Sequence, residues 1–255
     1  MTDDQCSGRD GRNDYELMAE FFDRRVDGYE EHMREILPAF DEFYSSVAGQ
    51  IPATGEPLSI LDLGCGTGLE LDFIFARAPN AAITAVDLSA EMLAKLKAKL
   101  GRVRYGPQVE IVQGSYLTMP FPAGGFDYAI SVQTMHHFTP DVKLGLYTRI
   151  AHALKAGGRY IEGDYVVSPG EERSLLARYA ELVKSLRAAG AVGEDELVDG
   201  KHHIDIPLSV QSQIEVLRKA GFADVEVVFE QGAAAVFCAG SRKGVAADHG
   251  ADGKI

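Results

Sequence analysis

The stretch that most constrains the fold of this chain runs from Leu58 to Glu70 and reads Leu-Ser-Ile-Leu-Asp-Leu-Gly-Cys-Gly-Thr-Gly-Leu-Glu. Its apolar run, 60–63, predicts a buried strand, and alternating glycines then lead into a helical pattern. Glycines permit positive φ angles and a close approach of a ligand to the main chain, and the N–H groups at a helix start favour a polar or anionic ligand group. The stretch therefore predicts a strand-loop-helix unit whose loop binds a ligand.

An acidic residue ends a predicted strand about 20 residues past this loop. In nucleotide-binding folds, an acidic residue at this separation forms hydrogen bonds with the ribose. The stretch Ala82 to Ser89 predicts a strand, and Asp87 closes its apolar part. A carboxylate there can accept hydrogen bonds from both ribose hydroxyls. Asp87 could instead cap the next helix, although Ser89 can form that cap itself.

The glycine loop permits two interpretations besides a site of the kind just described. A nicotinamide or flavin site would need a small residue at position 69 of a dinucleotide fingerprint that began at Gly64, and Leu69 stands there. The glycines could also form a purely structural turn.

Composition disfavours several classes of protein. The 255 residues, 46% of them hydrophobic, suffice for one well-buried core. Lys and Arg total 25 against 38 Asp and Glu, a formal charge of −13, which disfavours nucleic acid as a partner. Cys6, Cys65 and Cys238 lie in unrelated contexts, so we expect free thiols. The N-terminus lacks the regions of a signal peptide and no run of about 18 apolar residues occurs, so we expect a cytoplasmic protein without membrane association.

The N-terminal segment reads as a polar tail followed by helices. Residues 1–13 and 243–255 are expected to be disordered. An apolar stripe in 17–22 begins a helical pattern, and an amphipathic helix is predicted from Phe22 to Met33. A second helix, 33–47, contains Pro38, where a kink or a restart is expected.

Strands and helices alternate through the rest of the chain. The remaining predicted strands are 109–113, 126–132, 160–165, 222–230 and 233–239, the last two forming a hairpin. The predicted helices are 71–77, 144–154, 171–189 and 209–220. A turn over 155–159 leads into the strand at 160.

In this order, the motif Asp62-x-Gly64-x-Gly66-x-Gly68, the acidic Asp87, the Phe126-Asp127 strand and the Gly157-Gly158 turn resemble class I S-adenosylmethionine-dependent methyltransferases. The resemblance spans about Tyr15 to Arg242. It implies a single α/β domain, 14–242, with a Rossmann-like, seven-stranded, mostly parallel sheet whose last strand is antiparallel. It also implies an N-terminal helical lid, 14–50, and a helical insert after the fifth strand, 169–206, that caps the active site.

The resemblance further implies S-adenosylmethionine as the cofactor. The family's positions map here onto Tyr29, Asp62, Gly64, Cys65, Gly66, Gly68, Asp87, Leu88, Met92, Ser115, Tyr116 and Gln133. Ser115 stands where the family commonly has the Asp that accepts the adenine amino group, so the adenine contact is the weakest of these assignments. Tyr29-Glu30 looks like the Tyr-acid pair of a lid that closes over the cofactor.

Two side chains are candidates for acid-base chemistry. His137 follows the fourth strand at its carboxyl end, the ligand side of open α/β sheets, and an imidazole titrates near neutral pH. Glu162, on the fifth strand, is the second choice because a carboxylate would need a raised pKa. His202 and His203 are as readily solvated as functional. No metal site is expected, because the sequence shows no ligands at a readable spacing.

Several functional alternatives remain open at this point. The pattern is closest to methyltransferases that act on small molecules, and a homodimer is possible in this class. It is also similar to carboxy-S-adenosylmethionine synthases, which serve tRNA wobble modification, although these typically have Ser where Thr67 stands. Ser115 and the lack of an unambiguous base leave a non-catalytic cofactor-binding protein as a further alternative. An NAD-dependent oxidoreductase would bind NADH, and we expect no such binding.

Overall fold

Seven strands form one sheet in the order β3-β2-β1-β4-β5-β7-β6, within a computed structural model that describes residues 17–191, 193 and 201–241. The two predicted tails, 1–13 and 243–255, lie outside these described residues. The strands are β1 Ser59–Leu63, β2 Ala82–Asp87, β3 Val109–Gln113, β4 Phe126–Val132, β5 Leu154–Tyr165, β6 Phe222–Gln231 and β7 Ala234–Ser241. The helices are α1 Met18–Arg25, α2 Tyr29–Ile36, α3 Phe40–Gly49, α4 Leu71–Arg77, α5 Ala90–Leu100, α6 Pro140–Ala153, α7 Pro169–Ala188 and α8 Val210–Lys219, with short 3-10 helices η1 Gly106–Gln108 and η2 Met135–His137.

The direction of the strands confirms the predicted class of sheet. Strands β1 to β5 pair in parallel, whereas β7 pairs antiparallel with both β5 and β6. The chain runs outward from β1 through β2 to β3 and then returns to β4 on the other side of β1. The strand order therefore reverses between β1 and β4, and in open α/β sheets a ligand binds at the carboxyl ends of the strands at such a point.

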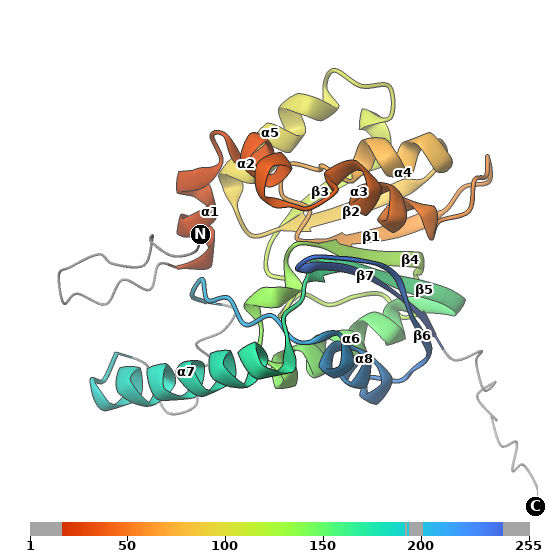
Figure 1. Cartoon of the computed structure of the whole chain (residues 1–255). Helices are drawn as coiled ribbons and strands as arrows, with labels where there is room; N and C mark the ends of the chain where they lie inside the picture. The colour runs from red at the N-terminus through yellow and green to blue at the C-terminus, as the bar shows by residue number, and fades with distance from the viewer. Residues whose placement is uncertain (1–16, 192, 194–200, 242–255) are drawn as a thin grey trace, which may run out of the picture.

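Helices cover both faces of the sheet, as Figure 1 shows. The core on one face includes Phe43 of α3, Ile74 of α4 and Leu96 of α5. The core on the other face includes Tyr147 of α6 and Leu217 of α8. All five side chains are buried, because the parallel strands between the two layers are apolar on both faces.

The N-terminal helices are more divided than the sequence predicts. The expected helix from Phe22 to Met33 breaks over 26–28, where Gly28 takes a left-handed φ of 79°. Pro38 separates α2 from α3, which is the restart that its missing N–H and its ring predict.

The predicted turn over 155–159 is part of β5 instead. Phe126 of β4 pairs with Leu154 and Tyr128 pairs with Arg159, so the residues between Leu154 and Arg159 form a bulge in the strand. Gly157 allows this bulge because it adopts a φ of 82°. The strand consequently begins before Tyr160.

The insert after β5 contains one long helix and an extended return. Helix α7 begins with a capping box in which the Ser168 side chain and Glu171 satisfy each other's backbone N–H groups. Figure 1 shows α7 beside the α6 and α8 layer. Residues 194–200 of the predicted insert lie outside the described residues. In the part of the chain that the structure describes, no helix is both long and apolar enough for a bilayer.

Candidate functional site

The glycine loop after β1 lies at the point where the strand order reverses. Gly64, Gly66 and Gly68 adopt left-handed φ angles of 74°, 50° and 72°. A Cβ on Gly64 would meet Thr134 at 2.6 Å and one on Gly68 would meet Leu71 at 2.7 Å, whereas one on Gly66 would meet nothing within 4 Å. Gly64 and Gly68 are thus needed for close packing, and Gly66 leaves open space at the tip of the loop.

Asp87, at the end of β2, holds this loop in place. Its two carboxylate oxygens accept hydrogen bonds of 2.8 Å from the N–H groups of Gly66 and Ser89. Burial raises the pKa of Asp87, and these two N–H groups oppose the rise. Ser89 caps α5 by accepting from the Met92 N–H at 3.1 Å, so the cap that was an alternative for Asp87 belongs to Ser89.

A cavity, here called the glycine-loop cavity, opens over these residues. Most of the predicted ligand-binding residues line it, namely Tyr29, Gly64, Gly66, Asp87, Leu88, Met92, Ser115, Tyr116 and Gln133, together with His137. Sequence reasoning missed others in the wall, including Met18, Phe22, Thr134 and Phe138. Met18 and Phe22 belong to the apolar stripe of α1 and gave no signal that distinguishes a cavity wall from a core.

Three predicted residues support the loop without lining the cavity. Gly68 and Cys65 form a turn in which the Gly68 N–H donates to the Cys65 carbonyl at 2.8 Å. Asp62 is buried beside Glu70, and burial together with that second carboxyl group raises its pKa well above the usual range. Burial raises the pKa of Glu70 to about 7. The two acids therefore favour sharing a proton beneath the loop.

Glu162 of β5 is buried and lines neither the glycine-loop cavity nor the second cavity beside it. Its Oε2 accepts hydrogen bonds from the hydroxyls of Tyr147 and Tyr160, at 2.7 and 2.9 Å. Burial raises the pKa of Glu162 to about 7, against the opposing charge of Lys143. Glu162 shares its face of β5 with Asp164, which contacts His136, but Glu162 is buried against Tyr147 of α6, so the structure does not bring it to the wall of either cavity.

The polar groups of the glycine-loop cavity suit a nucleoside with a charged tail. Gln133 is buried, takes a strained φ of 54°, and has both side-chain amide atoms without a hydrogen-bond partner among the described residues. Asp87 presents a carboxylate at the strand end, and Gly66 leaves the main chain bare. Unsatisfied buried polar atoms in a cavity are groups that a ligand can satisfy.

Comparison with known proteins decides which nucleoside this is. Residues 60–158, which include the loop, Asp87 and the β4 end, match the family described as "Methyltransferase domain". Residues 60–158 therefore form a methyltransferase domain of the class I S-adenosylmethionine-dependent type. S-adenosylmethionine is accordingly the cofactor of this methyltransferase, and the residues that line the glycine-loop cavity fit it.

Relatives and solved structures agree with this assignment. An "Uncharacterized methyltransferase" of Geobacillus thermodenitrificans is 27% identical, over 72% of this chain and 77% of its own length. A "Carboxy-S-adenosyl-L-methionine synthase" of Wolinella succinogenes is 29% identical, over 84% of this chain and 90% of its own. The crystal structure of human N-acetylserotonin methyltransferase with S-adenosylmethionine superposes with a TM-score of 0.58 at 18% identity, over 88% of this chain but only 56% of the human one.

A second, wider cavity, here called the histidine cavity, adjoins the first and shares lining residues with it. Phe22, Tyr29, Gln133 and His137 line both cavities, while His136 lines the histidine cavity alone. Burial and the Asp87 carboxylate raise the pKa of Tyr29 above its usual range. A ligand in one cavity would therefore share these walls with a ligand in the other.

The two adjacent histidines of the methyltransferase are both buried and both face carboxylates. His136 Nδ1 lies 2.5 Å from Asp164 Oδ1, and His137 Nδ1 lies 3.0 Å from Asp205 Oδ1. Burial lowers the pKa of His137 to about 4, helped by the neighbouring His136. Burial also acts downward on His136, but Asp164 outweighs it and raises the pKa. Both histidines therefore have specific carboxylate partners.

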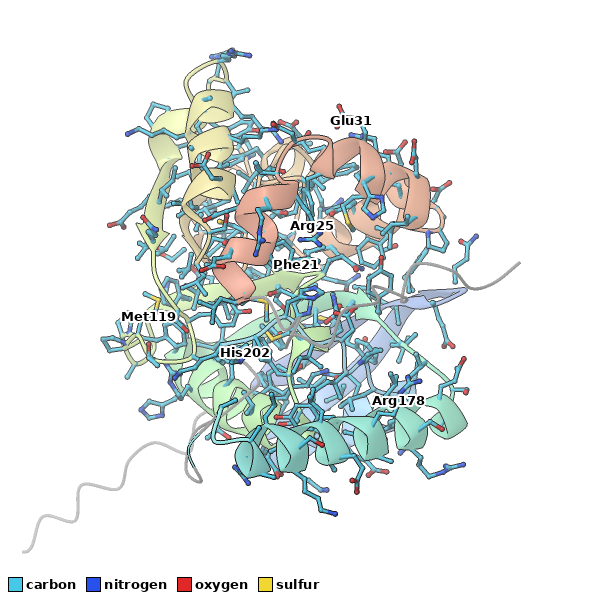
Figure 2. The ribbon with its side chains drawn as sticks, turned by 90° about the vertical axis from the view of Figure 1, so that its left-hand side faces the viewer. Phe21, Arg25, Glu31, Met119, Arg178 and His202 are labelled. Atoms are coloured by element: carbon cyan, nitrogen blue, oxygen red, sulfur yellow. The ribbon has the colours of Figure 1, made fainter. Side chains whose placement is uncertain are left out.

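His203 and Asp205 come from the described segment between α7 and α8, residues 201–209, here called the return segment. His203 stacks on Phe21 of α1 with 3.4 Å between the ring centroids. Figure 2 shows Phe21 and Arg25 on the α1 ribbon above the segment that carries His202. The backbone fixes this segment, because the Ile206 N–H donates to the His136 carbonyl at 2.6 Å. Thus the predicted cap reaches the site through this return segment, and α7 lines neither cavity.

Proposed function

We propose that this methyltransferase transfers a methyl group from S-adenosylmethionine to a small molecule that occupies the histidine cavity. The observation that carries the proposal is the shared wall of the two cavities, formed by Phe22, Tyr29, Gln133 and His137. A methyl donor and an acceptor held on either side of this wall would be neighbours. The formal charge of −13 supports a small molecule over a nucleic acid, and the human neighbour is named for the small molecule N-acetylserotonin.

Catalysis in this proposal rests mainly on proximity. The cofactor supplies a methyl group that is already activated on a sulfonium. Holding two reactants in line can contribute about 7–11 kcal/mol. Tyr29 and Phe22 would exclude water from the junction, and His137 would act on the acceptor, since it is the imidazole that lines both cavities.

We expect His137→Ala to lower turnover by about 10²–10⁴-fold, the usual contribution of a group that assists removal of a proton. The affinity for S-adenosylmethionine should stay within a factor of about two, since the main cofactor contacts come from the glycine loop and Asp87. Steady-state kinetics and calorimetry measure the two effects. His152→Ala is the matched control, because His152 is exposed on α6 outside both cavities. Full turnover in the His137 variant would contradict the role.

Helix α1 should act as a lid that one side chain latches to α5. Asp23 Oδ1 accepts hydrogen bonds from the Ser89 hydroxyl at 2.5 Å and the Glu91 N–H at 3.2 Å. Lys95 of α5 also donates to the Val26 carbonyl at 2.8 Å. A carboxylate at a helix N-terminus is stabilising. The contacts of Asp23 therefore join α1, the proposed lid, to the start of α5, which lines the glycine-loop cavity.

We expect S-adenosylhomocysteine to slow hydrogen exchange across 17–36, and Asp23→Ala to remove part of that protection. Losing a hydrogen bond worth about 1 kcal/mol should speed cofactor release roughly fivefold. Glu31→Ala removes an exposed acid from α2 and serves as the control. Equal release rates in the Asp23 variant and the native chain would show that the contact is not a latch.

A carboxy-S-adenosylmethionine synthase is the second candidate function, favoured by the relative that covers 84% of this chain. A non-catalytic cofactor-binding protein is the third. One assay separates the three: S-adenosylhomocysteine release in the presence of a metabolite library, with mass spectrometry of the products. Our proposal expects release that depends on one or a few small acceptors, with a product heavier by one methyl group. Formation of carboxy-S-adenosylmethionine, or no turnover with any acceptor, would contradict it.

A further inference from the structure

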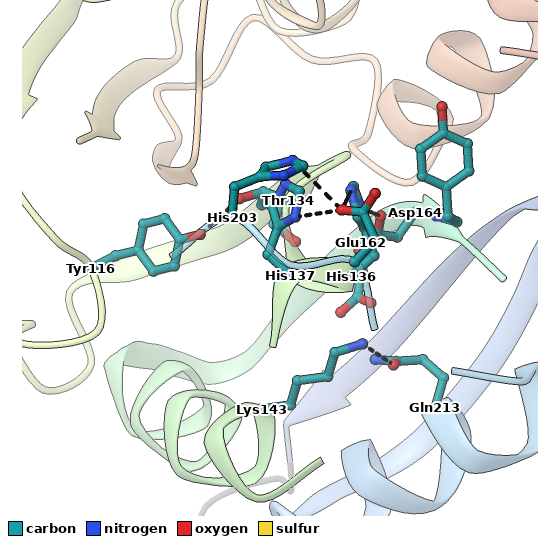
Figure 3. Close-up of polar contacts among 12 residues, drawn as sticks. Tyr116, Thr134, His136, His137, Lys143, Glu162, Asp164, His203 and Gln213 are labelled. Atoms are coloured by element: carbon teal, nitrogen blue, oxygen red, sulfur yellow. Dashed lines mark hydrogen bonds and ion pairs between the residues drawn. The ribbon is translucent and has the colours of Figure 1, made fainter. Parts of the chain in front are cut away.

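Three imidazoles converge on one carboxylate in the wall of the histidine cavity. Asp205 Oδ1 lies 3.0 Å from His137 Nδ1, 3.6 Å from His203 Nε2 and 3.8 Å from His136 Nε2. Figure 3 shows the side chains of His136, His137 and His203 close together, the first two from η2. The ligating atoms of His136, His137 and Asp205 all lie within 4.8 Å of one another.

Hydrogen bonds alone do not account for this arrangement. A carboxylate oxygen offers about two lone pairs, and three nitrogens surround this one. His137 Nδ1 is buried and lacks a well-aligned hydrogen bond within the described part of the chain. A single cation placed among the four atoms would satisfy all of them at once.

The distances from Asp205 Oδ1 to the three imidazoles resemble the edges of a transition-metal coordination shell. Nitrogen and oxygen ligands lie about 2.0–2.2 Å from Zn²⁺ in a tetrahedral site, which places the ligand atoms about 3.3–3.6 Å from one another. The three distances to Asp205 Oδ1, 3.0 to 3.8 Å, bracket that range. Small rotations of the side chains would suffice to centre an ion.

Asp164 provides the outer partner that such a site requires. Its Oδ1 lies 2.5 Å from His136 Nδ1 and also accepts from the Tyr165 N–H at 2.8 Å. With Nδ1 of His136 bound to a carboxylate, the lone pair is left on Nε2, which faces the cluster. A carboxylate behind a ligating histidine fixes the tautomer and raises the basicity of the ligand.

The cluster is also accessible to an incoming ligand. The side chains of His136 and His137 are 8% and 4% exposed, whereas that of Asp205 is 58% exposed. The buried histidines would hold the ion on the protein side. Asp205 marks the open side, where a further ligand can enter from the histidine cavity.

We propose that His136, His137, His203 and Asp205 bind one divalent transition-metal ion of the zinc class, and that this ion selects an acceptor that ligates through oxygen. The selectivity rests on the proposed methyl transfer, whereas the metal site does not. An acceptor hydroxyl that ligates the ion would lose its proton to solvent more readily. The oxygen lone pair would then form the new O–CH₃ bond as the S–CH₃ bond breaks, its electron pair staying on the sulfur of S-adenosylhomocysteine.

The test uses tag-free protein freed of metal with a chelator, then titrated with ZnCl₂ by calorimetry and with CoCl₂ by visible absorption. We expect one ion per chain and a cobalt spectrum of nitrogen and oxygen coordination. His203→Ala and Asp205→Ala should each weaken binding at least roughly 100-fold, since losing an outer partner alone costs about 10–100-fold. His32→Ala should change nothing, because His32 lines the same cavity outside the cluster.

Absence of stoichiometric binding, or binding that survives both variants, would overturn the metal site. S-adenosylmethionine affinity is measured on the same samples, so the two proposals fail separately. A chain that binds the cofactor and releases S-adenosylhomocysteine with an acceptor, yet binds no metal ion, refutes only this inference. A chain that binds the ion but methylates no acceptor keeps the site and refutes the acceptor selection along with the proposed function.

Discussion

Gly66→Val should reduce the affinity of this methyltransferase for S-adenosylmethionine by more than about 100-fold while leaving the chain folded. Gly66 takes a φ of 50°, and no heavy atom lies within 4 Å of the position of a Cβ. A valine side chain would therefore extend into the glycine-loop cavity rather than into protein. Its branched Cβ would also strain the left-handed backbone by about 1–2 kcal/mol, which is smaller than the stability of an ordinary domain.

Gly124→Val is the matched control for this variant. Gly124 has a φ of 59° and equally open surroundings, but it lies in an exposed turn outside both cavities. Both variants should lose similar stability in thermal unfolding, and only Gly66→Val should lose calorimetric affinity. Native affinity in the folded Gly66 variant would show that the glycine loop is a structural turn.

Asp87→Ala should weaken cofactor binding by about 1.5–3 kcal/mol, or roughly 10- to 150-fold. The substitution removes an acceptor for ribose hydroxyls, and it also frees the N–H groups of Gly66 and Ser89 that shape the loop. Asp87→Asn keeps one acceptor oxygen but not the charge, so its affinity for S-adenosylmethionine should fall between that of the native chain and that of Asp87→Ala. Isothermal titration with S-adenosylmethionine measures the series.

Asp127→Ala separates loss of a strand-end carboxylate from loss of the cofactor contact. Asp127 accepts from the Ser59 N–H at 2.8 Å and pairs with Lys155 at 2.7 Å, at the amino end of β4 away from the cavities. This variant should be less stable but should bind the cofactor normally once folded. An Asp87→Ala affinity as high as that of Asp127→Ala would remove Asp87 from the cofactor site.

The strands and the loop could be predicted because their signals are local. The predicted strands 109–113 and 126–132 match β3 and β4, and the mostly apolar sequence of β4 is typical of a buried parallel strand. The glycines of the loop likewise indicate, from their residue type alone, positions that adopt positive φ angles. The prediction of one continuous helix from Phe22 to Met33 was wrong, because amphipathic periodicity alone does not reveal the left-handed Gly28 between α1 and α2.

The histidine cluster could not be predicted, because its members are far apart in the chain. His137 and Asp205 meet only through the contact between η2 and the return segment after α7, which no local pattern encodes. The burial of Glu162 was equally invisible, since it depends on the packing of Tyr147 of α6 against β5. Long-range pairing and register are tertiary properties, and they decide which polar residues share a site.

The most direct measurement for the cofactor assignment is native mass spectrometry of the purified chain, before and after incubation with equimolar S-adenosylmethionine and NADH. We predict one S-adenosylmethionine or S-adenosylhomocysteine per chain, no NADH, and loss of the adduct in Gly66→Val but not in Gly124→Val. Retention of NADH, or no nucleoside adduct under any of these conditions, would contradict the account.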